Sequence, residues 1–103
     1  MPFGWLNASA ASDFGISLAD FYMTRVPTDM AASDKKFASH SKEVLDKMAL
    51  QVARFKQTHP LNVYKKAKLG NAFKWKLRDA GYDSAYIDRL TEWLVAKLEP
   101  QSQ

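Results

Sequence analysis

The chain has 103 residues, a common size for one domain and too short for two ordinary ones. Hydrophobic residues make up 47% and charged residues 25% of it, which is typical of a globular protein and excludes a disordered one. It contains no cysteine, so disulfide frameworks, thiolate zinc sites and cysteine nucleophiles are excluded.

The net charge of +4 is unevenly distributed along the chain. Residues 61–82 contain six basic side chains and one acidic side chain, whereas residues 1–33 and 83–103 each carry a net charge of −2. The simplest consequence of this pattern is attraction between the elements of one fold.

Targeting and membrane signals are weak in this sequence. The first basic residue is Arg25, so the N-terminus lacks the charged and apolar regions of a secretory signal. No apolar run approaches the roughly 20 residues that are needed to span a bilayer. We therefore expect a cytoplasmic protein with no membrane partner.

The chain is expected to form one helical domain over residues 12–100. Residues 1–11 are mostly small and polar, and we expect them to form a flexible arm. Residues 101–103 are expected to be a frayed tail.

A first helix is expected over about residues 13–24, with Ser12 as its N-cap and Pro27 beyond its end. Four apolar side chains share one face of this helix: Phe14, Leu18, Phe21 and Tyr22. Ile16 and Met23 lie on the opposite face. The helix therefore carries apolar groups on two sides.

A long second helix is expected over about residues 34–58, ended by His59 and Pro60, because the residue before a proline is pushed out of the helical conformation. Its apolar residues fall within one narrow sector of a helix. They are Phe37, Val44, Leu45, Met48, Val52 and Phe55.

A third helix is expected over residues 62–80, with Asn62 as its N-cap and Gly81 as its C-terminal stop. Its core face is predicted to consist of Leu69, Phe73, Leu77 and Ala80. A glycine inside a helix costs about 1 kcal/mol of stability relative to alanine. Gly70 therefore either lies within one helix at this cost or marks a break into two shorter helices.

A fourth helix is expected over residues 84–98, with Asp83 as its N-cap and Pro100 beyond its end. It has one broad apolar face, which consists of Tyr86, Ile87, Leu90, Trp93, Leu94 and Leu98.

These patterns predict an all-α, compact four-helix domain. No segment alternates apolar and polar residues in the way that a strand does, and no internal repeat is visible. We expect the second, third and fourth helices to form the core, with the first helix packed across them.

The usual signatures of catalysis are absent from the sequence. There is no glycine-rich phosphate loop, no nucleophile elbow and no zinc-protease helix motif. The two histidines, His40 and His59, are nineteen positions apart and are interpreted as surface or helix-cap residues. We therefore expect a protein that is not an enzyme and that has no cofactor, no metal site and no small-molecule substrate.

The third helix carries the most distinctive surface pattern. Basic and aromatic residues are interleaved on the side opposite its predicted core face and on the flanks of that side. The residues concerned are Tyr64, Lys65, Lys68, Asn71, Lys74, Trp75, Lys76 and Arg78. Cations that neutralise phosphates and rings that stack on unpaired bases suit nucleic acid. A break at Gly70 would add a helix–turn–helix shape.

The same pattern has a second interpretation. A central third helix buries two faces, and Tyr64 and Trp75 would then be core or subunit-interface residues with lysine stems against their edges. The acidic fourth helix would neutralise part of the basic charge.

The N-terminal region offers a second candidate surface. Its exposed apolar groups would be Phe3, Trp5, Leu6, Ile16 and Met23. Such groups mark a partner-binding surface, unless the arm folds back and caps the bundle. Our leading hypothesis is a non-catalytic module that binds another protein or itself through this region, and the alternative is nucleic-acid binding by the third helix.

Overall fold

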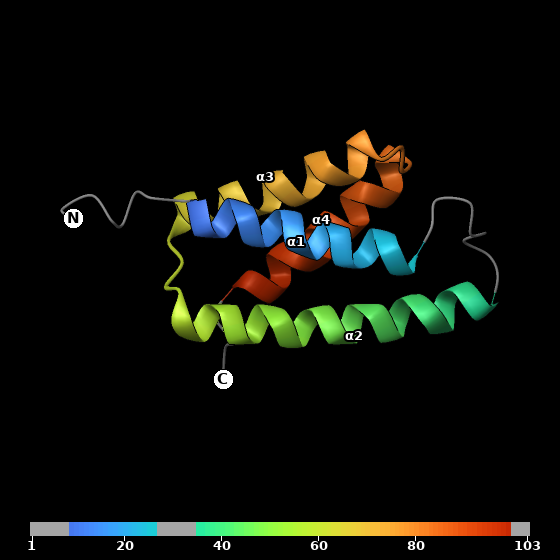
Figure 1. Cartoon of the computed structure of the whole chain (residues 1–103), viewed down its shortest axis with the longest axis horizontal. Coiled ribbons are helices and arrows are strands. Elements are labelled where there is room, and N and C mark those ends of the chain that lie inside the picture. The colour runs from blue at the N-terminus through green and yellow to red at the C-terminus, as the bar shows by residue number, and fades with distance from the viewer. Residues whose placement is uncertain (1–8, 27–34, 100–103) are drawn as a thin grey trace.

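The computed structural model describes residues 9–26 and 35–99, with the backbone alone for residues 35–39. Four helices and no strand occur in these two segments, so the all-α prediction is confirmed (Figure 1). The helices are α1 (Ser9–Arg25), α2 (Lys35–Thr58), α3 (Val63–Asp79) and α4 (Ser84–Leu98). None of the four is both long and apolar enough to cross a membrane.

The predicted boundaries of α2, α3 and α4 agree with the structure, and local side chains explain why. The Asn62 side chain accepts a hydrogen bond of 2.8 Å from the backbone N–H of Lys65, which caps α3. Asp83 caps α4 in the same way, through the N–H of Tyr86. Gly81, with a φ of +94°, supplies the left-handed conformation that ends α3.

α3 is one continuous helix through Gly70. The predicted alternative of two shorter helices at that residue is therefore wrong, and with it the helix–turn–helix arrangement. Gly70 is buried against α4, where Val95 Cγ2 lies 3.8 Å from the position that a Cβ on Gly70 would take. The glycine marks contact between two helices, not a break.

α1 begins at Ser9, four residues before the expected start. Ser12 therefore lies inside the helix and is not its cap, and residues 9–11 do not belong to an arm. Ala11 is buried, so its tertiary packing stabilises the extra turn of the helix. The rest of the expected arm, residues 1–8, and the expected tail, residues 101–103, lie outside the described residues.

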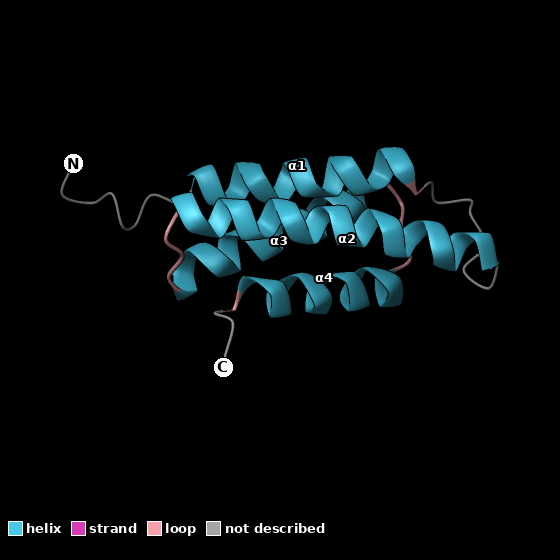
Figure 2. Cartoon of the chain, turned by 90° about the horizontal axis from the view of Figure 1, so that it is seen from below, coloured by secondary structure: helices cyan, strands magenta, loops and turns pink. Residues whose placement is uncertain are grey.

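α1 is one of the core helices of the bundle and packs closely along α3. It runs parallel to α3, while α2 packs along another side of α1 and α4 runs diagonally behind α1, from the end of α3 toward α2 (Figures 1 and 2). Leu18, Ala19, Tyr22 and Val26 are completely buried. The prediction that α2, α3 and α4 form the core is confirmed, but α1 also belongs to the core and runs alongside α3, so the prediction that it packs across the other three helices is wrong.

Small residues explain how α1 packs so closely on α3. Ala11, Gly15 and Ala19 recur at a spacing of four residues, and all three are buried. The backbone of α1 approaches α3 so closely at Gly15 that a Cβ there would lie 2.4 Å from the carbonyl oxygen of Leu69 and 3.2 Å from Cβ of Ala72. Only glycine permits this approach.

The other helices contribute the larger side chains of the core. Most of the predicted core residues are buried, but Ala80 is exposed because it lies beyond the last turn of α3. The buried hydrophobic residues of these helices and of the turn before α4 are Val44, Met48, Val52, Leu69, Phe73, Leu77, Tyr82, Ile87, Leu90, Leu94 and Leu98. The predicted apolar faces of α2, α3 and α4 are therefore confirmed in the main, although nothing is described of the Phe37 side chain.

Long-range hydrogen bonds satisfy the carbonyl groups where two helices end. Lys56 of α2 donates from Nζ to the carbonyl oxygens of Lys97 (3.0 Å) and Glu99 (2.8 Å), at the end of α4. His40 Nε2 lies 2.6 Å from the carbonyl oxygen of Arg25, at the end of α1. A cation or a donor at a helix C-terminus is favourable because the last carbonyls have no partner within the helix.

We expect Gly15→Ala and Gly70→Ala to change stability in opposite directions. At position 15 the new methyl group meets backbone atoms of α3, so α1 and α3 have to separate, at a cost of about 1–3 kcal/mol. At position 70 it makes ordinary van der Waals contact, so the gain in helix propensity of up to about 1 kcal/mol remains. Urea unfolding monitored by circular dichroism measures both changes, and equal effects of the two substitutions would contradict the close approach at Gly15.

Candidate functional site

The side of α3 that points away from the core forms a continuous exposed row, which we call the outer face of α3. It consists of Tyr64, Lys68, Asn71, Trp75 and Arg78, and all five residues are exposed. Tyr64 retains 46% and Trp75 retains 55% of its accessible surface. The two rings therefore do not belong to the core of this chain, so that part of the second interpretation is wrong.

Each ring of the outer face lies beside a cation of the same helix. Lys68 Nζ is 5.6 Å from the centroid of the Tyr64 ring, and Arg78 Cζ is 5.1 Å from that of Trp75. Such cation–π contacts are worth about 0.5–1 kcal/mol at exposed positions. They restrict the side chains and so lower the entropy cost of binding a partner.

The other three residues of the predicted basic pattern lie on the flanks of α3. Lys76 points toward α1, where its Nζ is 3.9 Å from Asp20 Oδ1. Lys74 points toward α4, where its Nζ is 3.6 Å from Asp88 Oδ1. Carboxylates therefore accompany the basic row on both sides. The sequence indicated the outer face, but it could not show that these two lysines pair with other helices.

Exposed apolar side chains also occur at the start of α3 and on the helix turns that contact it. Val95 of α4 is 40% exposed and adjoins Gly70, in the middle of α3. Ile16 of α1 is 38% exposed and follows Gly15, which contacts that same middle turn. Val63, the first residue of α3, is 82% exposed. Sequence analysis missed Val95 and Val63, because an apolar residue next to a predicted core face carries no signal of its own.

Two residues of the second predicted surface, in the N-terminal region, lie in the described part of the chain. Ile16 is exposed, but Met23 packs against the buried core and is not available as predicted. The remaining members, Phe3, Trp5 and Leu6, lie outside the described residues. Both apolar sides of α1 are largely used inside the bundle.

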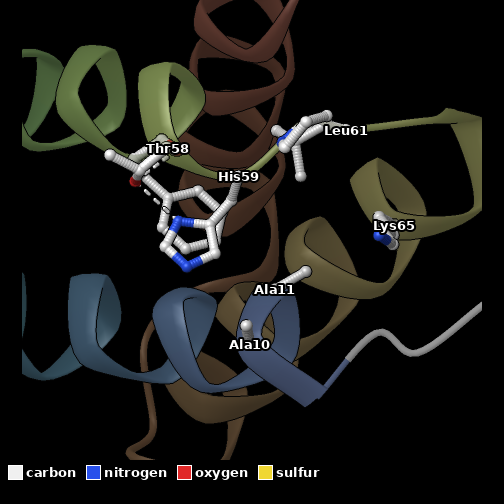
Figure 3. Close-up of a pocket in the computed structure, with 8 residues that line it drawn as sticks. Ala10, Ala11, Thr58, His59, Leu61 and Lys65 are labelled. Carbon is white, nitrogen blue, oxygen red and sulfur yellow. Dashed lines mark hydrogen bonds between the residues drawn. The ribbon is translucent and has the colours of Figure 1, made fainter. Parts of the chain in front are cut away.

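A small pocket of about 120 Å³ lies where the end of α2 meets the starts of α1 and α3 (Figure 3). Its lining residues are Ala10, Ala11, Phe55, Thr58, His59, Pro60, Leu61 and Lys65. The His59 ring stacks on Phe55 with centroids 4.3 Å apart, and its Nδ1 lies 2.8 Å from Thr58 Oγ1. Phe55 in turn stacks on Phe14 at 4.2 Å.

The pocket has the features of a packing defect between three helix ends. Its described lining residues include no carboxylate that could orient His59 as a general base. Among the described residues, no group of three or more histidine, aspartate or glutamate side chains is close enough together to hold a metal ion. The exposed outer face of α3 is therefore the stronger candidate site.

Three tyrosines form a cluster at the opposite end of the bundle. The hydroxyl groups of Tyr22 and Tyr86 hydrogen-bond to each other, and the Tyr82 hydroxyl donates to the carbonyl oxygen of Val26. Burial raises the pKa of Tyr86 to about 12 and also raises the pKa of Tyr82. These neutral, hydrogen-bonded hydroxyls tie the end of α1 to α4 and to the turn before it.

Comparison of the chain with known protein families, curated protein sequences and solved structures finds no match.

The tyrosine cluster predicts a loss of stability in alkali. An unfolded tyrosine ionises near pH 10 and folded Tyr86 near 12, so the folded chain retains a proton that the unfolded chain loses in this interval. Below about pH 10, ionisation of Tyr86 should therefore not change the free energy of unfolding. As the pH rises from 10 toward 12, that free energy should fall. Urea titrations from pH 9 to 11.5 measure it.

The control for this prediction is Tyr86→Phe, which removes the ionisable group but keeps the ring. We expect the variant to be about 1 kcal/mol less stable at neutral pH, because the Tyr22 hydroxyl loses a partner. Its further loss between pH 10 and 12 should be smaller than that of the original chain. An identical slope in both proteins would show that the Tyr86 hydroxyl does not cause the alkaline transition.

Proposed function

We propose that the protein is a non-catalytic interaction module that binds a protein through the outer face of α3. One observation carries this proposal. Of the large hydrophobic residues that are exposed in the described part of the chain, all but Leu50 belong to α3 or to the turns of α1 and α4 that contact it. They are Ile16, Val63, Tyr64, Trp75 and Val95. Exposed aromatic and apolar groups on and around one helix are typical of a docking surface.

The chemistry of the outer face fits a protein partner. Tryptophan, tyrosine and arginine are the residues that most often dominate the energy of protein interfaces. Trp75 and Arg78 stand together at one end of the face and Tyr64 at the other, with Asn71 between them. The face therefore offers two aromatic anchors that are joined by hydrogen-bonding groups.

This proposal moves the binding surface from the N-terminal region, where we first expected it, to α3. The expectation depended on apolar groups of the N-terminal arm and of α1. The arm residues Phe3, Trp5 and Leu6 lie outside the described residues, and in α1 most apolar residues pack into the bundle, so Ile16 is the one large hydrophobic residue of the helix that stays exposed.

Nucleic-acid binding by the same face is the alternative function. Lys65, Lys68 and Arg78 form no ion pair with the described acidic residues, which favours this alternative. However, Asp20 and Asp88 lie along the two flanks, so a phosphate backbone laid across α3 would meet carboxylates on both sides. A peptide surface meets no such conflict, and we therefore favour a protein partner.

Site-specific photo-crosslinking in the living cell tests the proposal. A benzophenone amino acid at position 75 should give a covalent adduct with a protein, because Trp75 lies in the proposed interface. The same amino acid at position 50 is the matched control, since Leu50 is similarly exposed but lies on α2. Absence of a protein adduct specific to position 75 would contradict the proposal.

Salt dependence distinguishes the alternative function. A protein contact built on Tyr64 and Trp75 should change little between about 50 and 200 mM salt, whereas binding to single-stranded DNA or RNA should weaken steeply as counterions return to the phosphates. Fluorescence anisotropy with labelled oligonucleotides measures the second process. Tight, salt-sensitive binding that Lys68→Ala and Arg78→Ala abolish would favour nucleic acid over protein.

A further inference from the structure

We infer that the partner of the outer face of α3 is a second copy of the same chain, bound antiparallel around a two-fold axis that passes near Asn71. This inference rests on the proposed function and names its partner. It is carried by the order of the residues along the face. When two copies of the face lie antiparallel, each ring of one copy meets a cation of the other.

The spacing of the outer face is symmetric about its middle to within one residue. Its residues follow one another at intervals of four, three, four and three, so Asn71 is seven residues from both Tyr64 and Arg78. Lys68 and Trp75 lie three residues before and four residues after Asn71. In an antiparallel pair centred on this residue, equal distances from the centre meet.

The residues that meet have complementary chemistry. Tyr64 of one copy faces Arg78 of the other, and Lys68 faces Trp75, so all four contacts between the copies join a cation to a ring. The cations already lie beside rings of their own chain, at 5.6 Å and 5.1 Å, and need little rearrangement to reach a second ring. Repulsion between the cations of the two copies is thereby offset.

Asn71 suits the position on the axis. A carboxamide has both donors and an acceptor, so two asparagines related by a two-fold axis can hydrogen-bond to each other. A single asparagine in the seam between two helices fixes their register, because any shift leaves its amide unpaired. Ile16 and Val95 flank this middle turn and supply apolar contact around the polar centre.

The flank that faces α1 adds a charge pair. Lys65 precedes Asn71 by six residues and Asp79 follows it by eight, and both lie on that flank of α3. A two-fold antiparallel arrangement keeps equivalent flanks on the same side, so Lys65 of each copy faces Asp79 of the other.

Cysteine crosslinking tests this geometry directly, because the chain has no cysteine of its own. Asn71→Cys places two thiols beside the axis, and mild oxidation should give a disulfide-linked dimer. Leu50→Cys, on the exposed side of α2, is the matched control. We expect crosslinking at position 71 to be at least about tenfold faster than at position 50, because association raises the effective concentration of the thiols.

Charge exchange provides a second measurement that does not depend on a new cysteine. Asp79→Lys should weaken dimerisation in sedimentation equilibrium by about three- to tenfold, since two symmetric ion pairs are replaced by like charges. The double variant with Lys65→Asp as well should restore it. Circular dichroism checks that the helical content of the variants is unchanged.

The outcomes separate this inference from the proposed function. Equal crosslinking at positions 71 and 50, together with a monomeric chain at all concentrations, would overturn the dimer. If position 75 then crosslinks to a different protein, the proposed function stands and only the second copy is wrong. If position 75 gives no protein adduct, or only a nucleic-acid adduct, both fail.

Discussion

The close approach of α1 and α3 at Gly15 is the contact on which the rest of the fold depends. The hydrogen atom of this glycine is all that separates the backbone of α1 from the Leu69 carbonyl, and Ala11 and Ala19 extend the narrow contact by a turn on each side. Two helices this close leave no room for bulky groups between them, so the rings of α1 pack against the other helices. Phe14 stacks on Phe55 of α2, and Tyr22 contacts Tyr86 of α4.

This arrangement also determines what α3 presents to solvent. α1 occupies one flank of α3 and α4 the other, and each contributes a carboxylate to a flanking lysine. The turns between these flanks carry Tyr64 and Trp75, which no other described element covers. A surface of aromatic rings and cations bordered by acids is specific in its electrostatic pattern as well as in its shape, which suits recognition of one partner over others.

Much of the fold follows from residues that act locally. Asn62, Asp83 and Gly81 are capping or stop residues whose effect extends over one turn, and the helices that they bound were predicted correctly. The place of α1 could not be predicted in this way. Gly15 and Ala19 contribute almost nothing to an apolar pattern, yet their lack of bulk lets α1 pack closely on α3.

The candidate site also has one part that local spacing predicts and one part that contacts between helices determine. The outward position of Tyr64, Lys68, Asn71, Trp75 and Arg78 follows from their spacing opposite the core residues of α3. By contrast, the pairing of Lys76 with Asp20, and the position of Val95 beside Gly70, depend on how separate helices meet. Interactions of this kind are set by the packed structure, so no local pattern in the sequence records them.

The ammonium group of Lys56 joins the last turn of α2 to the final carbonyls of α4. Each end therefore supplies hydrogen-bond partners to the other, so fraying of one end removes hydrogen bonds from the other. Amide hydrogen exchange at the two ends should consequently report a coupled opening, as for segments that unfold together. One side chain thus joins two helix ends that are about forty residues apart in sequence.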